Sequence, residues 1–389
     1  MERASDIIII GAGLAGLTAA IHLSKIGYQV VIIDNHDFPK HKVCGEYISN
    51  EILPYFDWLG LDVTTLKPTK IDQIILSTVK GKTLEAKLPL GGFGVSRYSL
   101  DYFLYRKAIN QKCLFIQEWV TNIHFFNDSF SVTLANNKVL KTVIVLGAFG
   151  KRSQLDQKLK RGFFQKKSPW LAVKGHYTGS FPDTIVGLHN FEGGYCGVSK
   201  VENDSINICY LADYNTFKNY KNIGDYEKKV VCKNPNLQFI FENATPIFDK
   251  PLTIGQISFD KKEPIEKHIL MLGDAAGLIH PLCGNGMAMA IHSAKIASEL
   301  VDDYFNSPIN SRVALEKKYI QLWNQNFKNR LKFGRLLAKV LRKQKLSEIV
   351  MRILILMPFL LPELIKKTHG KLLVKPKNDH QYKIQNQSA

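Results

Sequence analysis

One short stretch decides how this chain folds: residues 6–16 read DIIIIGAGLAG. The isoleucine run is typical of a β-strand that is buried on both faces. After the glycines, an apolar segment with helical periodicity covers about Leu14–Ile26, and Gly27 supplies its stop signal. A second β-branched run, Val30–Ile33, ends in the acidic residue Asp34. The pattern predicts a strand, a helix and a second strand, with the glycines at the first turn.

The spacing of the glycines indicates what this turn does. Gly11 permits a tight turn, Gly13 lets the backbone approach a pyrophosphate at the helix N-terminus, and Gly16 allows close helix–strand packing. Asp34 lies where a carboxylate can accept hydrogen bonds from ribose hydroxyls. A glycine-rich turn that binds nothing is the alternative. The complete unit predicts a dinucleotide site, without deciding between FAD and NAD, built from Gly11, Ala12, Gly13, Leu14, Ala15, Gly16 and Asp34.

A second glycine-rich segment lies far along the chain. Residues 269–272 are apolar, and GDAAGLIHPLCGNG follows at 273–286. A long helical pattern then runs from Met287 to about Tyr304. The segment predicts a strand that feeds a second helix N-terminus, where negative charge on a reduced cofactor can be stabilised.

These two segments resemble the FAD-dependent aromatic hydroxylase superfamily, most closely its geranylgeranyl-reductase-like branch. The likeness covers about residues 5–305. It implies an α/β fold with a Rossmann-type FAD-binding domain, an inserted antiparallel β-sheet substrate domain and a C-terminal helical extension. It also implies FAD as the cofactor and NAD(P)H as the electron donor. In the second segment it implies that FAD is bound by Gly273, Asp274, Pro281, Gly284, Asn285 and Gly286.

The resemblance also assigns roles to residues between the two glycine segments. Lys42 and Cys44 lie in a basic-x-Cys-Gly loop, which passes near the flavin and the substrate in the reductase branch. Glu46 is a candidate proton donor, and a surface charge is its alternative. Arg97 opens an Arg-x-x-Leu-Asp-x-x-Leu segment whose arginine contacts the cofactor in the family. The alternatives are an inert, buried Cys44 and a surface Arg97 at a helix start.

Two further strands carry expectations from the family. A strand predicted over Phe115–Ile123 holds Val120, whose backbone would contact the adenine. Another strand leads into Gly147-Ala148-Phe149-Gly150, where the family has an aspartate in place of Phe149. In hydroxylases that aspartate is implicated in handling both FAD and NAD(P)H. The replacement therefore puts the usual nicotinamide contact in doubt.

Between residues 162 and 259 the pattern changes to short alternating segments, which predict an antiparallel sheet. The segment 193–198 resembles a Gly-Gly-Tyr stretch that faces the substrate cavity in the reductase branch. Tyr195 and Cys196 are therefore candidate cavity residues, with a plain core strand as the alternative. His280 is the best placed histidine for a direct role, although such histidines are more often structural. The predicted catalytic residues are Cys44, Glu46, Tyr195 and His280.

The charge of the chain is concentrated at one end. The 389 residues carry a formal net charge of +18, and +12 of it lies in residues 328–389. A basic tail favours an anionic partner, and because nothing matches a recognition module for nucleic acid, we expect a membrane surface. From Leu315 an amphipathic, cationic helix pattern leads to an apolar segment, 349–362, too short and interrupted to span a membrane. It predicts an interfacial anchor; a helical lid or brace on the FAD domain is the alternative.

The cysteines and the changes of pattern bound the location and the domains. Six cysteines without C-x-x-C spacing favour a reduced, cytoplasmic location. The basic extension adds the expectation of a peripheral position at the inner face of the membrane. We assign the FAD-binding domain to residues 1–80, 97–160 and 263–308, the substrate domain to 81–96 and 161–262, the helical extension to 309–374 and a disordered tail to 375–389.

Three functions fit these patterns. We favour slightly an FAD-dependent, NAD(P)H-driven monooxygenase that hydroxylates a lipophilic aromatic or phenolic substrate, because hydroxylases prevail in the superfamily. The Cys-Gly loop and the Gly-Gly-Tyr segment instead favour a geranylgeranyl-reductase-like reductase of isoprenoid C=C bonds. A non-catalytic FAD-binding protein on a membrane surface is the third alternative. The W-x-W-x-I-P motif of flavin halogenases is absent.

Overall fold

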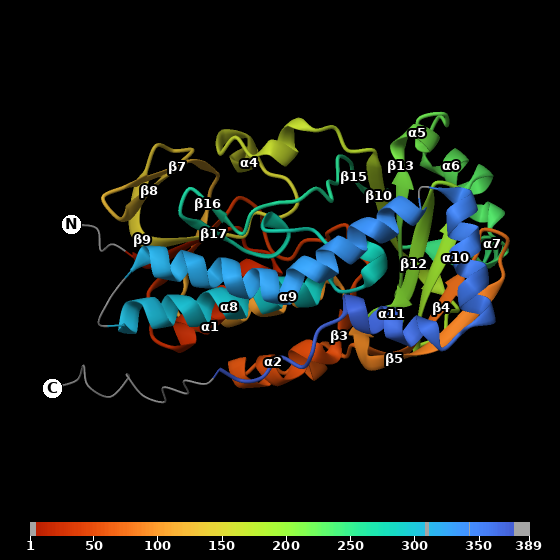
Figure 1. The fold of residues 1–389 in the computed structure, drawn as a ribbon, viewed down its shortest axis with the longest axis horizontal. Helices are drawn as coiled ribbons and strands as arrows, with labels where there is room; N and C mark the ends of the chain where they lie inside the picture. Colours follow the sequence, from red (N-terminus) through yellow and green to blue (C-terminus); the bar gives the residue numbers. More distant parts are fainter. Residues whose placement is uncertain (1–4, 308–310, 342, 377–389) are drawn as a thin grey trace.

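The computed structural model describes residues 5–307, 311–341 and 343–376. Two β-sheets lie at opposite ends of an elongated molecule, and long helices run along one side (Figure 1). The first sheet carries the strand–helix–strand unit predicted from the glycine turn. The site described below lies between the two sheets.

The first sheet is largely parallel and contains the predicted unit at its centre. Its main strands run in the order β16-β17-β9-β1-β2-β6, and β1 pairs in parallel with both β2 and β9. Their bounds are Ser5–Ile10 (β1), Val30–Asp34 (β2), Leu114–Gln117 (β6), Val139–Gly147 (β9), Ile265–Glu266 (β16) and Ile269–Met271 (β17). The isoleucines of β1 are buried, as expected for a strand covered on both faces.

Helices cover this sheet, and a hairpin extends it. The helices that support the glycine turns are α1 (Leu14–Lys25), α3 (Arg97–Asn110) and α8 (Gly286–Asn306), while α2 (Leu53–Leu59) and α4 (Gln154–Lys158) are shorter. The hairpin consists of β7 (Val120–Phe126) and β8 (Ser129–Leu134). The prediction of one strand over Phe115–Ile123 was wrong, because β6 pairs in parallel with β2 whereas β7 pairs antiparallel with β8. The chain changes direction between them, directly before Val120.

The second sheet is predominantly antiparallel, as predicted, but contains one parallel pair, β4 with β11. Its strands are β3 (Tyr47–Ser49), β4 (Thr69–Ser77), β5 (Thr83–Gly94), β10 (Trp170–Gly179), β11 (Ile185–Phe191), β12 (Gly194–Lys200), β13 (Ile206–Asp213), β14 (Ala244–Pro246) and β15 (Leu252–Ile254). Since β3 and β4 belong to it, this sheet takes strands from the segment 1–80, which we had assigned wholly to the FAD-binding domain. The short helices α5 (Tyr214–Phe217), α6 (Ile223–Lys229) and α7 (Pro235–Glu242) cover its outer face.

Within its described residues, 311–341 and 343–376, the C-terminal extension forms three helices with two different roles. They are α9 (Arg312–Leu341), α10 (Gln344–Leu356) and α11 (Leu360–Thr368). α9 packs along α8, where Trp323 and Phe327 are buried and the Tyr319 hydroxyl donates to the Met271 carbonyl at 2.5 Å. α10 and α11 pack on the second sheet, with Met351 and Leu361 in a shared core cluster. The first helix is therefore a brace on the FAD-binding domain.

Two expectations about this region concern a membrane-spanning helix and a disordered tail. Within the residues that the structure describes, every helix is too short or too polar to cross a bilayer. Of the predicted disordered tail, residues 377–389 lie outside the described ranges.

Candidate active site

The two glycine turns line a single cavity of about 960 Å³ between the two sheets. Gly11 and Gly13 line it from the first turn, and Asp274 and Gly284 line it from the second. The turns also approach each other directly, because a Cβ added to Gly273 would lie 3.2 Å from the Cβ of Ala15. Segments more than 250 residues apart in the sequence therefore form one site.

The glycines of the first turn have the geometry that their spacing predicts. Gly11 has a φ of +103°, and a Cβ there would lie 2.4 Å from the Ala148 carbonyl oxygen. A Cβ on Gly16 would lie 1.9 Å from the Gly11 carbonyl oxygen, so helix and strand are in direct backbone contact. At Gly13, by contrast, the nearest atom is Arg97 Nη2 at 3.9 Å. The space in front of Gly13 is therefore open to a ligand, which fits a bound dinucleotide.

Both helices that begin at these turns present backbone N–H groups at the cavity. Gly13 is the N-cap of α1 and Asn285 is the N-cap of α8, and neither helix start has a side-chain cap. Such a start leaves donors and a positive partial charge for a phosphate or a reduced ring. Asp34 lines the cavity at the end of β2 and accepts from the Ala12 N–H at 2.7 Å. The ribose-binding position predicted for Asp34 therefore lies beside the pyrophosphate turn.

Arg97 is held beside Gly13 by a buried ion pair. Its Nε and Nη2 donate to the two oxygens of Asp101 at 2.7 and 2.8 Å. Lys42 Nζ donates to the same carboxylate at 2.8 Å. Burial opposes the charge on Arg97, but Asp101 raises its pKa, so the guanidinium stays charged. The predicted cofactor contacts Lys42 and Arg97 are thus positioned together by Asp101.

The second turn is held at Asp274 by one buried basic side chain, that of Lys262. Lys262 Nζ donates to the Asp274 carbonyl at 2.7 Å and to the Lys151 carbonyl at 2.8 Å. Burial lowers the pKa of Lys262 to about 8. Pro281 and Gly286 line the cavity, and their contact with the flavin stays a prediction.

Asn285 does not line the cavity but supports the turn from behind. Its Nδ2 donates to Glu51 Oε2 at 3.0 Å, and Arg330 Nη1 donates to its Oδ1 at 3.3 Å. The predicted residues Ala12 and Gly16 are likewise outside the lining, in the backbone that shapes the first turn. Val120 and Phe149 line the cavity.

The Cys-Gly loop is joined to the substrate sheet by a buried charge cluster. The Glu46 carboxylate accepts from Lys174 Nζ at 2.5 Å, from His176 Nε2 at 2.7 Å and from the Arg97 N–H at 2.7 Å. Burial alone would raise the pKa of Glu46, but His176 and Lys174 lower it, so the carboxylate is ionised. Glu46 is therefore a buried anion, not the surface charge that was its alternative.

Sequence reasoning missed the partners of this loop. Lys174 and His176 lie on β10, and Asn207 on β13 donates to the carbonyl oxygens of Cys44 and Gly45 at 3.3 and 2.9 Å. The only indication in the sequence was that Lys174 and His176, two positions apart, place polar side chains on a face of the strand that we expect to be apolar.

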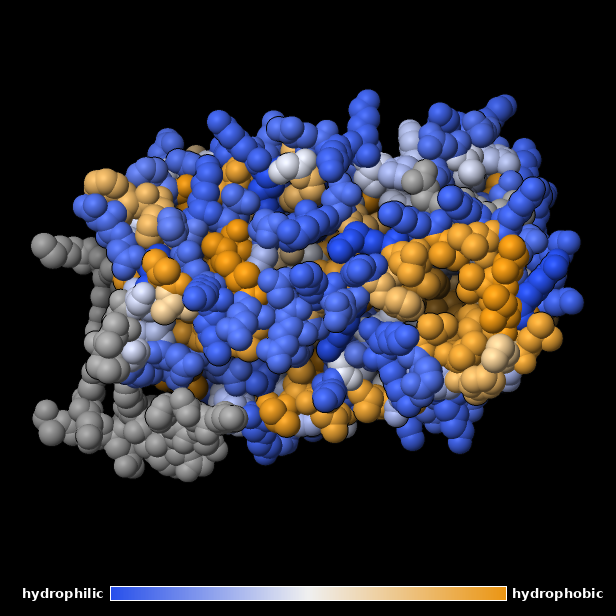
Figure 2. Space-filling view, viewed as in Figure 1, coloured by the Kyte–Doolittle hydropathy of each residue, from blue (hydrophilic) through white to orange (hydrophobic). Residues whose placement is uncertain are grey.

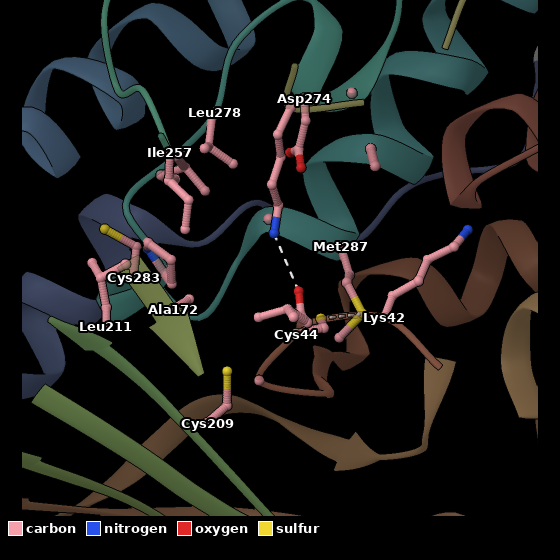
Figure 3. Close-up of a pocket in the computed structure, with 18 of the residues that line it drawn as sticks. Lys42, Cys44, Ala172, Cys209, Leu211, Ile257, Asp274, Leu278, Cys283 and Met287 are labelled. Carbon is pink, nitrogen blue, oxygen red and sulfur yellow. Dashed lines mark hydrogen bonds between the residues drawn. The ribbon is translucent and has the colours of Figure 1, made fainter. Parts of the chain in front are cut away.

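Strand register decides which residues of the substrate sheet face the cavity. Tyr195 pairs with Leu211, and Gly197 pairs with Cys209, and all four line the cavity. Cys196 points to the opposite face and is fully buried in the core under α5–α7, so its prediction as a cavity residue was wrong. Figure 3 shows Cys209 pointing from the sheet toward Cys44.

Cys44 and His280, two predicted catalytic residues, have different surroundings. Cys44 lines the cavity, and its Sγ lies 3.6 Å from Met287 Sδ on α8 (Figure 3). His280 is buried behind the Pro281 turn, outside the cavity lining, and burial lowers its pKa to about 3. A neutral imidazole at this place supports the turn, since its Nδ1 accepts from the Leu282 N–H at 3.4 Å.

Comparison with known families agrees with this site. The model of the FAD dependent oxidoreductase family matches residues 6–43, the segment of the first turn. The chain is an FAD-dependent oxidoreductase.

Curated relatives cover most of the chain. A digeranylgeranylglycerophospholipid reductase of Methanococcus vannielii is 23% identical, over 87% of this chain and 88% of its own. A menaquinone reductase of Mycobacterium tuberculosis is 22% identical, over 78% of both chains. The ubiquinone hydroxylase UbiM of Neisseria meningitidis is 22% identical, over 77% of this chain and 69% of its own. These matches are consistent with the predicted likeness to the geranylgeranyl-reductase-like branch.

Solved structures share the fold over nearly the whole chain. The flavin-dependent brominase Bmp2 has a TM-score of 0.77 at 19% identity, covering 94% of this chain and 93% of its own. PqsL of Pseudomonas aeruginosa, a probable FAD-dependent monooxygenase, has a TM-score of 0.72 at 16% identity, covering 90% and 100%. At these identities the likeness concerns the fold alone, which combines a Rossmann-type α/β unit with C-terminal helices.

Proposed function

We propose that this protein reduces carbon–carbon double bonds in the isoprenoid chain of an amphiphilic lipid. The observation that carries the proposal is the course of the cavity, which continues from the glycine turns past Cys44 to a wall of aliphatic side chains. That wall is built by β4, β5, β11, α10 and α11, from Ile74, Leu76, Leu88, Val186, Leu188, Leu354, Leu361, Leu364 and Ile365. Aliphatic walls suit an isoprenoid chain, which has no polar group to be satisfied.

FAD, when bound and reduced, supplies a hydride to one carbon of the double bond, and the other carbon takes a proton. Gly13, Arg97 and Asp274 are the residues that would hold it. The rest of the site has to orient the chain, exclude water and deliver the proton. NADH or NADPH is the electron donor that we expect, although Phe149 replaces the aspartate of the usual nicotinamide contact.

Cys44 is the residue that we propose as the proton donor. Its thiol lines the cavity on the loop between the glycine turns and the aliphatic wall. The loop is fixed from behind, since Asn207 holds the Cys44 and Gly45 carbonyls and Lys174 Nζ donates to the Lys42 carbonyl at 3.2 Å. Such support keeps a side chain in the productive geometry.

Glu46 and its partners suit the supply of protons to this loop. His176 contacts Glu46, and the His41 ring lies 5.2 Å from the His176 ring, centre to centre. Burial lowers the pKa of His41, with Lys174 and His176 adding to the effect. We infer that the Glu46 carboxylate and the His176 ring relay the proton that replaces the one lost by Cys44.

The test is product formation under argon. Purified protein with reduced nicotinamide or dithionite and a polyprenyl lipid should yield a product that has gained two hydrogens per reduced bond, detected by mass spectrometry. In deuterated water the hydrogen that arrives as a proton should be deuterium, and with dithionite as the reductant both should be, because the reduced flavin then also takes its hydrogen from the solvent. The Cys44→Ala variant should keep its flavin and lose turnover, whereas Cys113→Ala, a buried cysteine away from the cavity, serves as the control. An unchanged kcat in Cys44→Ala would exclude the thiol as proton donor.

Hydroxylation of a lipophilic phenol is the second candidate, supported by the similarity to a ubiquinone hydroxylase. It requires O₂ as co-substrate, whereas the reduction does not. Product that forms only in air, with oxygen consumed in step with the nicotinamide, would replace the reductase proposal by this one.

A further inference from the structure

The helices α10 and α11, and the turn between them, expose several large apolar residues. Leu356 is 81% exposed, Phe359 is 62% exposed and Ile349 is 53% exposed. Figure 2 shows a large apolar patch over these helices, with a hollow at its centre. A large exposed apolar patch of this kind indicates a binding surface for a membrane or for another protein.

Cations accompany this patch and leave it with a clear positive charge. The exposed cations of the segment 343–371 are Lys343, Lys345, Arg352, Lys366, Lys367 and Lys371. They stand against Glu348 and Glu363, which gives a net charge of +4. One cation, Lys366, is paired with Glu363 at 2.7 Å. An apolar centre with a cationic surround complements a bilayer that carries anionic headgroups.

The same helices form the far wall of the cavity. Met351 and Leu354 of α10, and Leu361 and Ile365 of α11, line it on their inner sides. The outer side of α10 carries the exposed residues Ile353 and Leu356, and the turn before α11 carries Phe359. The same helices therefore contribute to the aliphatic wall of the cavity with their inner faces and to the apolar patch with their outer faces.

We propose that α10 and α11 dock the protein on an anionic phospholipid bilayer, so that the hollow in the patch opens toward the acyl chains. A lipid substrate then slides its chain from the bilayer into the cavity without crossing water. The docking surface rests on exposure and charge alone, while this lateral route rests on the proposed function.

The docking is tested by sedimentation with vesicles, without any activity measurement. The full chain should sediment with vesicles of phosphatidylserine and phosphatidylcholine, and weakly with phosphatidylcholine alone. One cation near an anionic bilayer strengthens binding by about fivefold, so Arg352→Glu with Lys367→Glu should weaken it by more than about thirtyfold. Leu356→Ser with Phe359→Ser should abolish the binding that remains at high salt, because salt screens charges but not apolar contacts.

Matched control variants lie at the opposite end of the molecule (Figure 1). Phe126 on β7 is 66% exposed, and Lys141 on β9 is exposed. Phe126→Ser and Lys141→Glu should bind vesicles like the native chain. Circular dichroism of each variant verifies that it is folded.

Three results would overturn the docking surface: equal binding to vesicles of phosphatidylcholine alone, native binding by the patch variants, or a stable dimer that buries the patch in solution. The route has a separate test. Folded patch variants should keep activity on a short-chain, water-soluble substrate and lose it on a substrate embedded in anionic vesicles. Activity lost on both substrates would refute the route while leaving the docking result in place.

Discussion

The buried contact between Glu46 and Lys174 offers a direct test of the site's architecture. Both side chains are fully buried, and the carboxylate accepts three hydrogen bonds, from Lys174, His176 and the Arg97 N–H. In Glu46→Gln the Lys174 ammonium stays buried without its anion. Breaking a buried pair on one side in this way costs about 3–5 kcal/mol. We therefore expect a lower unfolding midpoint and a loosened Cys-Gly loop.

A double variant separates charge from packing. In Glu46→Gln with Lys174→Met both charges are gone, and replacing a buried pair by groups of similar volume is often close to neutral. The double variant should recover most of the stability that the single variant loses, in thermal unfolding followed by near-ultraviolet circular dichroism. A single variant that loses less than about 1 kcal/mol, or a double variant no more stable than it, would refute this account of the cluster.

The remaining predictions concern the cofactor turn, its support, pH and the extension. Gly13→Val should abolish flavin absorbance in the purified protein while leaving its unfolding midpoint nearly unchanged, because the cavity in front of Gly13 is open; retained flavin would contradict this. Asp101→Asn should weaken FAD binding by about tenfold or more, measured by flavin fluorescence, because Arg97 and Lys42 lose their common anion, and unchanged affinity would argue against it. The pKa of Glu46 is lower in the folded protein than in the unfolded chain, so the ionised carboxylate stabilises the fold above the ordinary carboxyl pKa. This stabilisation should disappear as the pH falls through the lowered pKa of Glu46 in the folded protein. The Glu46→Gln variant should lack that part of the acid unfolding transition. Removing residues 328–389 should lower the unfolding midpoint of the body, because Leu331 and Leu361 are buried, and an unchanged midpoint would contradict the role of a brace.

The parts of the fold that depend on local patterns could be predicted from the sequence. The unit 6–34 was recognisable because burial on both faces demands the β-branched run and the close helix contact demands Gly16. The long helix α8 was predicted from its periodicity within two residues at each end. Both features are set by neighbours in the chain.

The parts that depend on distant pairing could not be predicted. Cys196 and Cys209 both lie in alternating strands, and only the register of β12 with β13 shows that Cys209 faces the cavity and Cys196 does not. The cluster of Glu46 with Lys174 joins residues 128 positions apart. Its members resemble ordinary surface charges until the loop and the sheet are brought together.

The contact of Glu51 with the end of the described chain has a practical consequence. Its Oε2 accepts from the Gly370 N–H at 2.7 Å and from Asn285 at the start of α8, while its carbonyl accepts from the Leu373 N–H at 2.7 Å. The exit of α11 is thereby tied to the turn where the coenzyme would lie. Hydrogen exchange of the Gly370 amide should therefore slow when the coenzyme binds. This distant backbone segment would then report coenzyme binding without a substrate and without a measurement of flavin absorbance.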